Sequence, residues 1–409
     1  MKKVLSLVLC TMLAFTLCTA VAGAEGTVEL EVVCNHANVG TLDATMDELI
    51  SEFTAETGIK VNYSAIGQGY EELLKTRMAS NDMPDVFTTH GWAVVRYSAY
   101  LQPLNDQPYY SEIADGIRSI VTDKDGNLLV LPANYTVFGI DYNADVLSQA
   151  GVNPDDIKTW EDFEAACDAV KAIGKAPIAM GGKDSWVAAQ FYQDVCASLL
   201  NDEDAAALAD GSFDWEKIRP IAERYVKWVQ NGYFNADCVT ADYTTACKEL
   251  AVGDAAFVIC GASAISNGLK YNPDAKLHMI PVPSADASGE QFAIGGENLS
   301  WGVWKDSPNK EAALKLVEFL ARKENITKQA NAMLMVPGIK DAEFDAGTLT
   351  EDFVKLAAYK IKGVWDRSLP SGMFNDMCTS GQSILSGDPN AVDATIEQFK
   401  MSYADKMGQ

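Results

Sequence analysis

The chain has 409 residues, a length that allows two or three domains. Its composition is typical of a folded protein, with 48% hydrophobic and 22% charged residues, and it excludes wholesale disorder, a collagen-like repeat and a coiled-coil rod. Acidic residues outnumber basic ones by 57 to 32, so the formal net charge is −25. This charge argues against nucleic acid and anionic lipid surfaces as partners, because both bind basic protein surfaces.

The first 24 residues are typical of a secretory signal peptide. Two lysines precede an apolar run from Val4 to Cys18, and residues 22–24 form an A-x-A cleavage pattern. A retained membrane anchor is the alternative, but the run is short for a span. Cys18 leaves a lipid anchor open, although Leu17 departs from the small residue that a lipobox has before its cysteine. We expect a mature chain of 409 − 24 = 385 residues, without a membrane span, that works outside the cytoplasm.

The cysteines do not form a recognisable site. Of the 9 cysteines, Cys10 and Cys18 lie in the predicted signal peptide, which leaves 9 − 2 = 7 in the mature chain. An odd number leaves at least one thiol unpaired. The spacings are wide and include no C-x-x-C pair, so we expect neither a zinc site nor a redox motif. Buried apolar thiols in a reducing niche are the interpretation that we favour.

The first part of the mature chain alternates strand and helix patterns. Residues 28–34 predict a strand, and residues 42–57 predict a helix because their apolar positions recur at helical spacing. A strand at 59–63, a helix at 70–78 and a strand beginning at Pro84 follow. This alternation is typical of an α/β layer with parallel strands.

The segment Asp123–Asn127 resembles a calcium loop at first sight. Its glycine is at the fourth position instead of the sixth, and no glutamate occupies the twelfth, so a hairpin turn at Asp-Gly is the better interpretation. We expect a strand over 128–131 that Pro132 breaks, and a single strand over 137–142.

The second half continues the mixed pattern. Thr159 to Asp162 predicts a capped helix start, and helices follow to about residue 230. Four tryptophans on helix starts, helices or strands are interpreted as packing residues: Trp160, Trp215, Trp228 and Trp304. Further strands are expected near 177–180, 256–260 and 276–282, an extended segment at 292–304, and an amphipathic helix at 310–322. No repeat or low-complexity linker separates the halves, so we expect them to interleave.

In this order the segments resemble the extracellular solute-binding proteins of ABC sugar importers, the maltose-binding-protein-like family. Each motif is weak alone, but six of them occur in the family's order and span nearly the whole mature chain. They are Phe53–Val61, Met83–Phe87 (the "PDVF" strand), Asp125–Pro132 with Tyr142-Asn143, Thr159–Phe163 (the "TWEEF" helix start), Gly295-Gly296 and Ser307–Ala313.

The resemblance implies an α/β fold of two lobes joined by hinge strands, the type II periplasmic-binding-protein architecture. Lobe 1 would comprise residues 25–138 plus 298–345, and lobe 2 residues 139–297 plus 346–409. A carbohydrate, expected to be a di- or oligosaccharide, would bind in the cleft between them, and closure would bury it. The resemblance further implies a monomer that delivers its ligand to the transmembrane subunits of an ABC permease.

A sugar site requires aromatic rings that stack on the sugar, and polar groups that bond its hydroxyls. In open α/β sheets such groups follow the carboxyl ends of strands. Asn35 and His36 come after the first strand, and Trp92 follows the strand that begins at Pro84. Tyr135 precedes the first crossover, where the family often contacts ligand. We therefore predict all four as ligand contacts.

Further candidates lie in the second half of the chain. Asp184 and Trp186 end a glycine-rich loop, and Trp186 is the strongest single candidate for a stacking platform. Gly296 and Glu297 lie at the return crossover, where glycine permits close backbone approach and glutamate accepts hydroxyl protons. Trp365 lies in a predicted loop beside Asp366. By resemblance, Phe374 matches a stretch that supplies an aromatic platform.

Two alternatives to a sugar-binding protein remain. A secreted glycoside hydrolase is possible because 57 acidic residues always offer some pair of carboxylates. However, the sequence has no G-x-S-x-G, no H-E-x-x-H and no complete nucleotide-binding glycine motif. A polyamine or another small solute would also suit a cleft with acids and aromatic rings. We predict a non-enzymatic binding protein without a cofactor or a metal.

Overall fold

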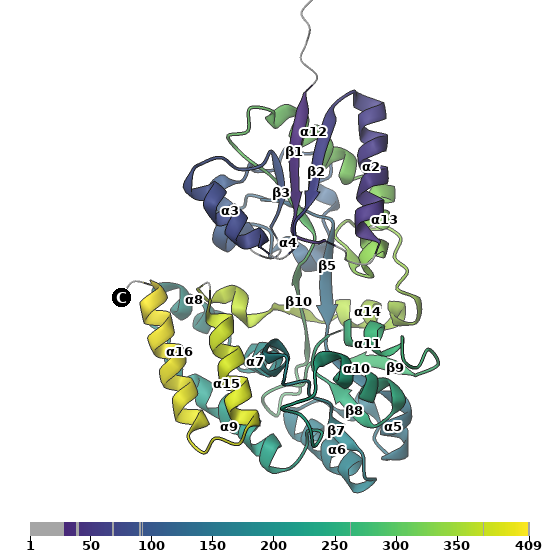
Figure 1. Cartoon of the computed structure of the whole chain (residues 1–409), viewed down its shortest axis with the longest axis vertical. Helices are drawn as coiled ribbons and strands as arrows, with labels where there is room; N and C mark the ends of the chain where they lie inside the picture. The colour runs from purple at the N-terminus through teal and green to yellow at the C-terminus, as the bar shows by residue number, and fades with distance from the viewer. Residues whose placement is uncertain are drawn as a thin grey trace, which may run out of the picture.

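The structure is a computed structural model that describes residues 28–37, 41–67, 69–89, 91, 93–261, 263–370 and 372–407. The predicted signal peptide and Trp92 lie outside the described residues. Two bodies are stacked along the long axis of the molecule, and extended strands join them at a waist (Figure 1). Both bodies combine sheets with helices, which confirms the predicted two-lobe α/β fold.

Lobe 1, the upper body in Figure 1, is built on a five-stranded sheet with the order β2-β1-β3-β11-β4. Strand β1 pairs in parallel with β2 and β3, whereas β11 is antiparallel to β3 and β4. The strands are β1 (Glu29–Cys34), β2 (Lys60–Ala65), β3 (Val86–Thr88), β4 (Leu131–Pro132) and β11 (Ser300–Val303). The helices are α2 (Leu42–Thr57), α3 (Tyr70–Ala79), α4 (Asp115–Arg118), α12 (Lys310–Leu320) and α13 (Lys323–Met333), with a π-helical turn η1 (Ala93–Tyr97).

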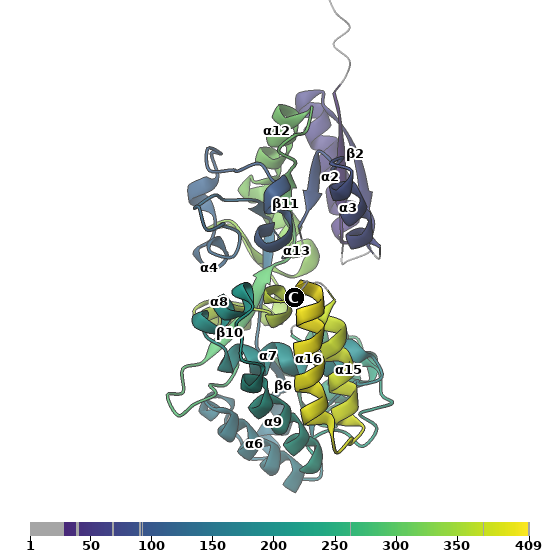
Figure 2. The same cartoon turned by 90° about the vertical axis from the view of Figure 1, so that its left-hand side faces the viewer.

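Lobe 2, the lower body, contains a four-stranded sheet with the order β7-β8-β6-β9. Its strands are β6 (Ile140–Asn143), β7 (Ala176–Ile178), β8 (Ala255–Val258) and β9 (Leu277–Ile280), and β7 and β8 are parallel. Its helices are α5 (Ala144–Gln149), α6 (Trp160–Ala172), α7 (Ser185–Leu199), α8 (Asp202–Asp210), α9 (Arg219–Gln230), α10 (Tyr243–Val252), α11 (Ser263–Gly268), α15 (Met373–Leu385) and α16 (Ala391–Met407). Helices α15 and α16 lie side by side at one flank of this lobe (Figure 2).

A third sheet, with the order β12-β5-β10-β13, joins the lobes. Strand β10 (Phe292–Glu297) pairs antiparallel with β5 (Asn134–Phe138) and parallel with β13 (Lys360–Gly363), and β12 (Val336–Pro337) lies at the edge. Helix α14 (Thr350–Ala357) and the short turn η7 (Trp365–Ser368) flank β13. The chain thus passes between the lobes along β5, β10 and the segment that contains β13, so each lobe is assembled from separate parts of the sequence.

Local sequence signals explain the best-predicted helices. Helix α2 has the predicted bounds, and it buries Leu42, Met46, Leu49 and Phe53 on one face. Gly58 ends it at φ 72°, in the left-handed region that favours glycine. At the start of α6, Thr159 accepts a hydrogen bond from the Asp162 amide, and the Asp162 carboxylate accepts one from the Thr159 amide. This capping box confirms the predicted capped helix start.

The single strand predicted over 137–142 is wrong, because the chain divides at Gly139 into β5 of the joining sheet and β6 of lobe 2. A β-carbon at Gly139 would be 1.8 Å from the carbonyl oxygen of Ile280, so only glycine permits this close approach. The strand ends at Pro132, as predicted, and the proline is itself the last residue of β4. Because β4 is an edge strand, the missing amide proton costs the sheet no internal hydrogen bond.

The predicted turn at Asp123–Asn127 is confirmed. The Asp123 carboxylate accepts hydrogen bonds of 2.9 Å from the amides of Asp125 and Asn127, and Gly126 has a φ of 83°. The strand expected over 128–131 begins only at Leu131, although Thr122 and Leu128 form an isolated antiparallel bridge across the turn.

The four tryptophans interpreted as packing residues, Trp160, Trp215, Trp228 and Trp304, are all buried, which confirms the interpretation. In lobe 2, Trp228 packs against Trp160, Phe163 and Phe191 in an aromatic core. Every cysteine of the described residues is a free thiol, and five of them are buried: Cys34, Cys167, Cys196, Cys247 and Cys378. Within the described part of the chain, no helix is long and apolar enough to cross a bilayer.

Candidate ligand-binding cleft

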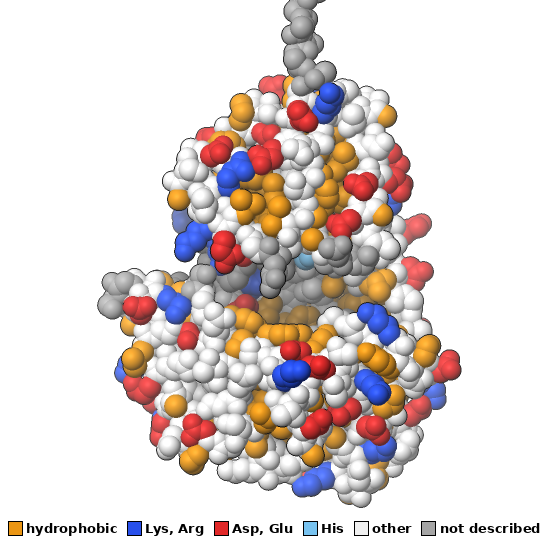
Figure 3. All heavy atoms as spheres, viewed as in Figure 1, with side chains coloured by type: hydrophobic (Ala, Val, Ile, Leu, Met, Phe, Trp, Pro, Cys, Tyr) orange, Lys and Arg blue, Asp and Glu red, His pale blue; other side chains and the backbone are white. Residues whose placement is uncertain are grey.

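The surface is hollowed between the two lobes, and hydrophobic side chains gather along the lower rim of this cleft (Figure 3). Topology explains which residues reach it. Strands β1 and β3 are parallel in lobe 1, so the loops that follow them, at Asn35 and Gly91, share one edge of the sheet. Strands β7 and β8 are parallel in lobe 2, so the loops before Asp184 and Ser263 also share an edge. These are the edges at which open α/β sheets bind ligands.

On the lobe 1 side of the cleft, Asn35 joins the ends of β1 and β3. The backbone amide of Asn35 donates to the Thr88 hydroxyl (2.9 Å), and that hydroxyl donates to the Asn35 side-chain oxygen (2.7 Å). The Tyr70 hydroxyl, from the first turn of α3, donates to the carbonyl oxygen of Thr88. The ends of β1 and β3 are therefore joined through side chains, which fixes the position of the predicted residue Asn35.

His36 lies beside the return crossover. Its imidazole interacts with the main chain of Asn298, the residue after β10. Burial lowers the pKa of His36 to about 4, more than the Asn298 contact raises it. The imidazole is therefore neutral at pH 7, so it can donate through one nitrogen and accept through the other.

The joining sheet places Tyr135 and Glu297 opposite each other as Cα partners on β5 and β10. The Tyr135 ring is buried, and its hydroxyl lies 3.7 Å from the position of a β-carbon at Gly116, in α4. A β-carbon at Gly296 would meet no atom within 4 Å, so space is open beside this hinge residue.

Glu297 is 2% exposed and is directed toward lobe 1. Its carboxylate accepts hydrogen bonds from the Thr89 hydroxyl and from the Ala93 amide (3.4 Å). Burial raises the pKa of Glu297 to about 7, although the charge of Arg367 and the main chain at Gly91 act in the opposite direction. The carboxyl group consequently exchanges its proton near neutral pH.

Lobe 2 contributes an aromatic pair. The rings of Trp186 and Tyr243 are 4.8 Å apart at an angle of 59°, and both are partly exposed. Asp184 accepts a 2.9 Å hydrogen bond from the Tyr243 amide and so fixes the start of α10 next to the start of α7. The Tyr243 hydroxyl bonds the Ser263 hydroxyl (2.9 Å). The structure thus brings the predicted residues Asp184 and Trp186 together, and it adds Tyr243, which the sequence analysis missed.

Charged residues that the sequence analysis did not select also lie between the lobes. Arg367, in η7 of lobe 2, packs against Gly91 of lobe 1. Its neighbour Asp366 is half-buried, and desolvation raises its pKa, while the charges of Arg367 and of Arg96 in lobe 1 lower it. Arg96 forms an ion pair with Glu71. No local pattern in the sequence reveals these contacts, because the partners come from three separate segments, around residues 71, 91–96 and 366–367.

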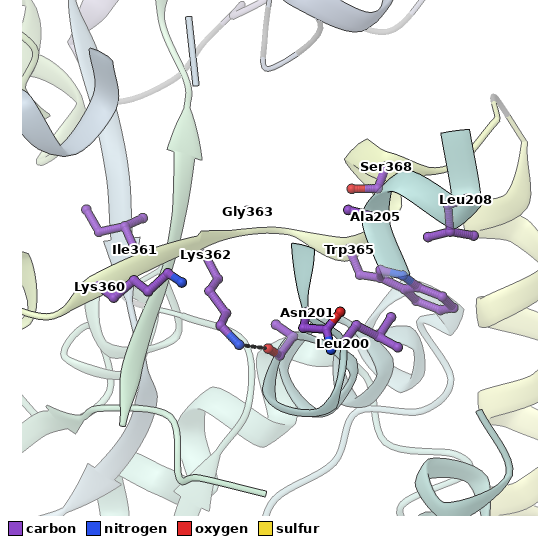
Figure 4. Close-up of a pocket in the computed structure, with 11 residues that line it drawn as sticks. Leu200, Asn201, Ala205, Leu208, Lys360, Ile361, Lys362, Gly363, Trp365 and Ser368 are labelled. Carbon is purple, nitrogen blue, oxygen red and sulfur yellow. Dashed lines mark hydrogen bonds between the residues drawn. The ribbon is translucent and has the colours of Figure 1, made fainter. Parts of the chain in front are cut away.

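Trp365 packs within lobe 2. Its ring is buried in lobe 2 with its centroid 6.0 Å from that of Phe399. It lines a separate pocket of about 310 Å³ between β13, the end of α7 and α8 (Figure 4). Phe374 is half-buried in the first turn of α15 and packs against the core of lobe 2. The structure therefore does not join Trp365 or Phe374 to the Trp186–Tyr243 pair by a direct contact.

Together these residues provide ring faces, neutral imidazole, hydroxyl, amide and carboxyl groups. This set suits a neutral polyhydroxylated molecule, whose C–H faces stack on rings and whose hydroxyls need both donors and acceptors. Among the described residues, no group of histidine, cysteine and acidic side chains could hold a metal ion.

Residues 48–360 match the family model for bacterial extracellular solute-binding proteins. The chain belongs to this family. Members of this family are binding proteins that work outside the cytoplasm. The match therefore agrees with two predictions from the sequence, a binding protein and an extracytoplasmic location.

A curated relative of this solute-binding protein is the melibiose/raffinose/stachyose-binding protein MelE of Bacillus subtilis strain 168. The two are 30% identical over 349 residues, which cover 83% of this chain and 81% of the relative.

Two solved structures are also similar. A binding protein of Bacillus subtilis in an open conformation superposes with a TM-score of 0.88 at 27% identity, covering 94% of this chain and 99% of the other. A sugar transporter protein of Bacillus licheniformis in complex with stachyose superposes with a TM-score of 0.77 at 29% identity, covering 92% of this chain and 100% of the other.

Proposed function

We propose that this solute-binding protein captures an oligosaccharide in the interlobe cleft and delivers it to the permease of an ABC importer. The main observation in support is the partly exposed Trp186–Tyr243 pair, fixed by Asp184 at the carboxyl edge of the lobe 2 sheet. Across the cleft, lobe 1 and the hinge offer Asn35, His36 and Glu297 as hydrogen-bonding groups. Rings on one side and polar groups on the other are the arrangement that a sugar requires.

The relatives narrow the ligand class. MelE is named for melibiose, raffinose and stachyose, and the similar Bacillus licheniformis protein was crystallised with stachyose. We therefore propose a di- to tetrasaccharide of this series as the ligand. A neutral sugar is also compatible with the high acidity of the chain, because it is not repelled by negative charge.

Binding is proposed to close the lobes. The chain superposes better on the structure described as open (TM-score 0.88) than on the stachyose complex (0.77), although the sequence identities are similar. A ligand that contacts both lobes stabilises the closed form by its greater affinity for that form. Closed lobes then present a joint surface to the transmembrane subunits.

Several features of the function rest on the sequence alone. We propose cleavage after Ala24, to which a lipid anchor at Cys18 is the alternative, and a monomer without catalytic activity. The lobe boundaries at 138/139, 297/298 and 345/346 stay a prediction.

Isothermal titration calorimetry tests the ligand class. We expect heat of binding with melibiose, raffinose or stachyose, and none with spermidine as the polyamine probe. Incubation with each saccharide should release no reducing sugar. Binding of spermidine without binding of any saccharide would favour the polyamine alternative, and released reducing sugar would favour the hydrolase.

A further inference from the structure

The Asp366-Arg367 pair of lobe 2 contacts the loop of lobe 1 that follows β3. A β-carbon at Gly91 would be only 1.0 Å from Nη1 of Arg367 and 2.3 Å from its Cζ. The guanidinium group therefore occupies the space that a side chain at position 91 would need. Gly91 also has a φ of 84°, in the region that favours glycine. Both this backbone conformation and the adjacent Arg367 side chain therefore disfavour any larger residue at position 91.

The buried carboxyl group of Glu297 is anchored to the same loop. It accepts hydrogen bonds from the Thr89 hydroxyl and the Ala93 amide, two residues before and two residues after Gly91. The charge of Arg367 acts favourably on this carboxylate. The guanidinium group thus approaches both a glycine surface and a carboxyl group that belong to the lobe 1 side of the cleft.

On the lobe 2 side, the Asp366-Arg367 pair is held by a hydrogen bond to α7. The backbone amide of Asp366 donates a 3.0 Å hydrogen bond to Oε1 of Gln193 in α7. The Asp366 carboxylate lies 3.8 Å from Nε of Arg367 and is acted on by Arg96 across the cleft. The charge of Arg96 thus acts favourably on Asp366, as the charge of Arg367 does on Glu297.

We infer that Arg367 is an interlobe brace, whose guanidinium group rests on Gly91 and limits how far the two lobes open in the absence of ligand. Arginine suits this role better than lysine, because its planar guanidinium group can lie flat on a glycine backbone while it faces a carboxylate. The inference concerns the ligand-free protein, so it can fail or succeed independently of the proposed sugar binding.

Small-angle X-ray scattering of the ligand-free full chain tests the brace. Arg367→Ala and Gly91→Ala should each shift the radius of gyration to a larger value, the first by removing the brace and the second by displacing it. In the double variant the shift should equal that of Arg367→Ala alone, because no guanidinium group is left to displace. Gly174→Ala is the matched control, since Gly174 has a φ of 79° but no atom within 4 Å of its β-carbon position.

An unchanged radius of gyration in Arg367→Ala would overturn the inference, and so would additive shifts in the double variant. If Gly91→Ala fails to fold, Arg367→Lys decides the question. Lysine keeps the charge but lacks the planar group, so the shift should approach that of Arg367→Ala. If Arg367→Lys keeps the wild-type radius of gyration while Arg367→Ala shifts it, the effect comes from charge alone. That result would contradict the proposed contact of the guanidinium group with Gly91.

Discussion

Two ionisable residues of the cleft have pKa values shifted in opposite directions by the same cause. Burial disfavours the charged form of each, so it lowers the pKa of His36 to about 4 and raises that of Glu297 to about 7. Near neutral pH the imidazole is uncharged and the carboxyl group is only partly ionised. These two residues therefore add little charge to the cleft at pH 7, and both can exchange hydrogen bonds with sugar hydroxyls.

Glu297→Gln should change how stability depends on pH. An unfolded glutamate ionises near 4.5, whereas Glu297 in the folded protein keeps its proton up to about pH 7. Between these values the folded state binds more protons, so the free energy of unfolding falls as the pH rises and levels off above 7. The fall is on the order of 3 kcal/mol at most, from roughly 1.4 kcal/mol per pKa unit.

Urea denaturation of both proteins at several pH values between 4 and 8 measures this difference. The stability of the wild type relative to Glu297→Gln should decrease from pH 4.5 to 7. Parallel curves over this range would show that the Glu297 carboxyl group titrates normally in the folded state.

Trp186→Ala should weaken saccharide binding by about 1–3 kcal/mol, because it removes one ring of the aromatic pair. Calorimetry with whichever saccharide binds the wild type measures the loss. Tyr271→Ala is the control, since this ring is 48% exposed and precedes β9, at the edge of the sheet opposite the loops after β7 and β8. Equal affinities of Trp186→Ala and the wild type would remove Trp186 from the site.

At the scale of elements, the sequence predicts those that local signals determine. Helix α2 has its predicted bounds because apolar spacing and Gly58 act locally. The division at Gly139, and that of the segment 292–304 into β10 and β11, depend on which sheet each strand joins. Sheet membership is decided by packing between distant segments, which periodicity does not report.

The candidate site shows the same limit. A glycine-rich loop pointed to Trp186, but Tyr243 is brought to it from another segment, and nothing local marks it. Trp365 was selected because it is aromatic and in a predicted loop. In the short turn η7, Trp365 packs into lobe 2 whereas Arg367, two residues later, reaches lobe 1. Which of two neighbouring side chains reaches the other lobe depends on backbone conformation, which the sequence alone does not reveal.

The hinge strands offer a matched pair of glycine variants. Gly139→Ala should destabilise the protein by at least about 2 kcal/mol, because its β-carbon would overlap the Ile280 carbonyl oxygen, and neither backbone can move freely. Gly296→Ala adds the same methyl group where no atom lies within 4 Å and should change stability by less than about 1 kcal/mol. Chemical denaturation measures both. Equal stabilities of the two variants would contradict the close approach at Gly139.

At the scale of the whole molecule, ligand should make the protein more compact and more stable. Saturating saccharide should reduce the radius of gyration in solution, because the lobes close. At about 100 times the dissociation constant it should also raise the free energy of unfolding by roughly 2.7 kcal/mol. Trp186→Ala at the same sugar concentration should show smaller changes in both. Stabilisation without compaction would indicate that binding does not close the lobes.

The two C-terminal helices complete lobe 2 from the far end of the chain. Gly381 of α15 packs against Ala188 of α7, and the Tyr403 hydroxyl of α16 bonds the carbonyl oxygen of Leu208. During synthesis, the last strand of the lobe 1 sheet, β11, is complete at Val303. The last helix that covers the core of lobe 2, α16, ends about a hundred residues later, at Met407. A chain that ends before Met373 would keep all of the lobe 1 sheet but would expose the apolar surface of lobe 2 that α15 and α16 cover. We therefore expect a protease to cleave lobe 2 of this shortened chain before lobe 1.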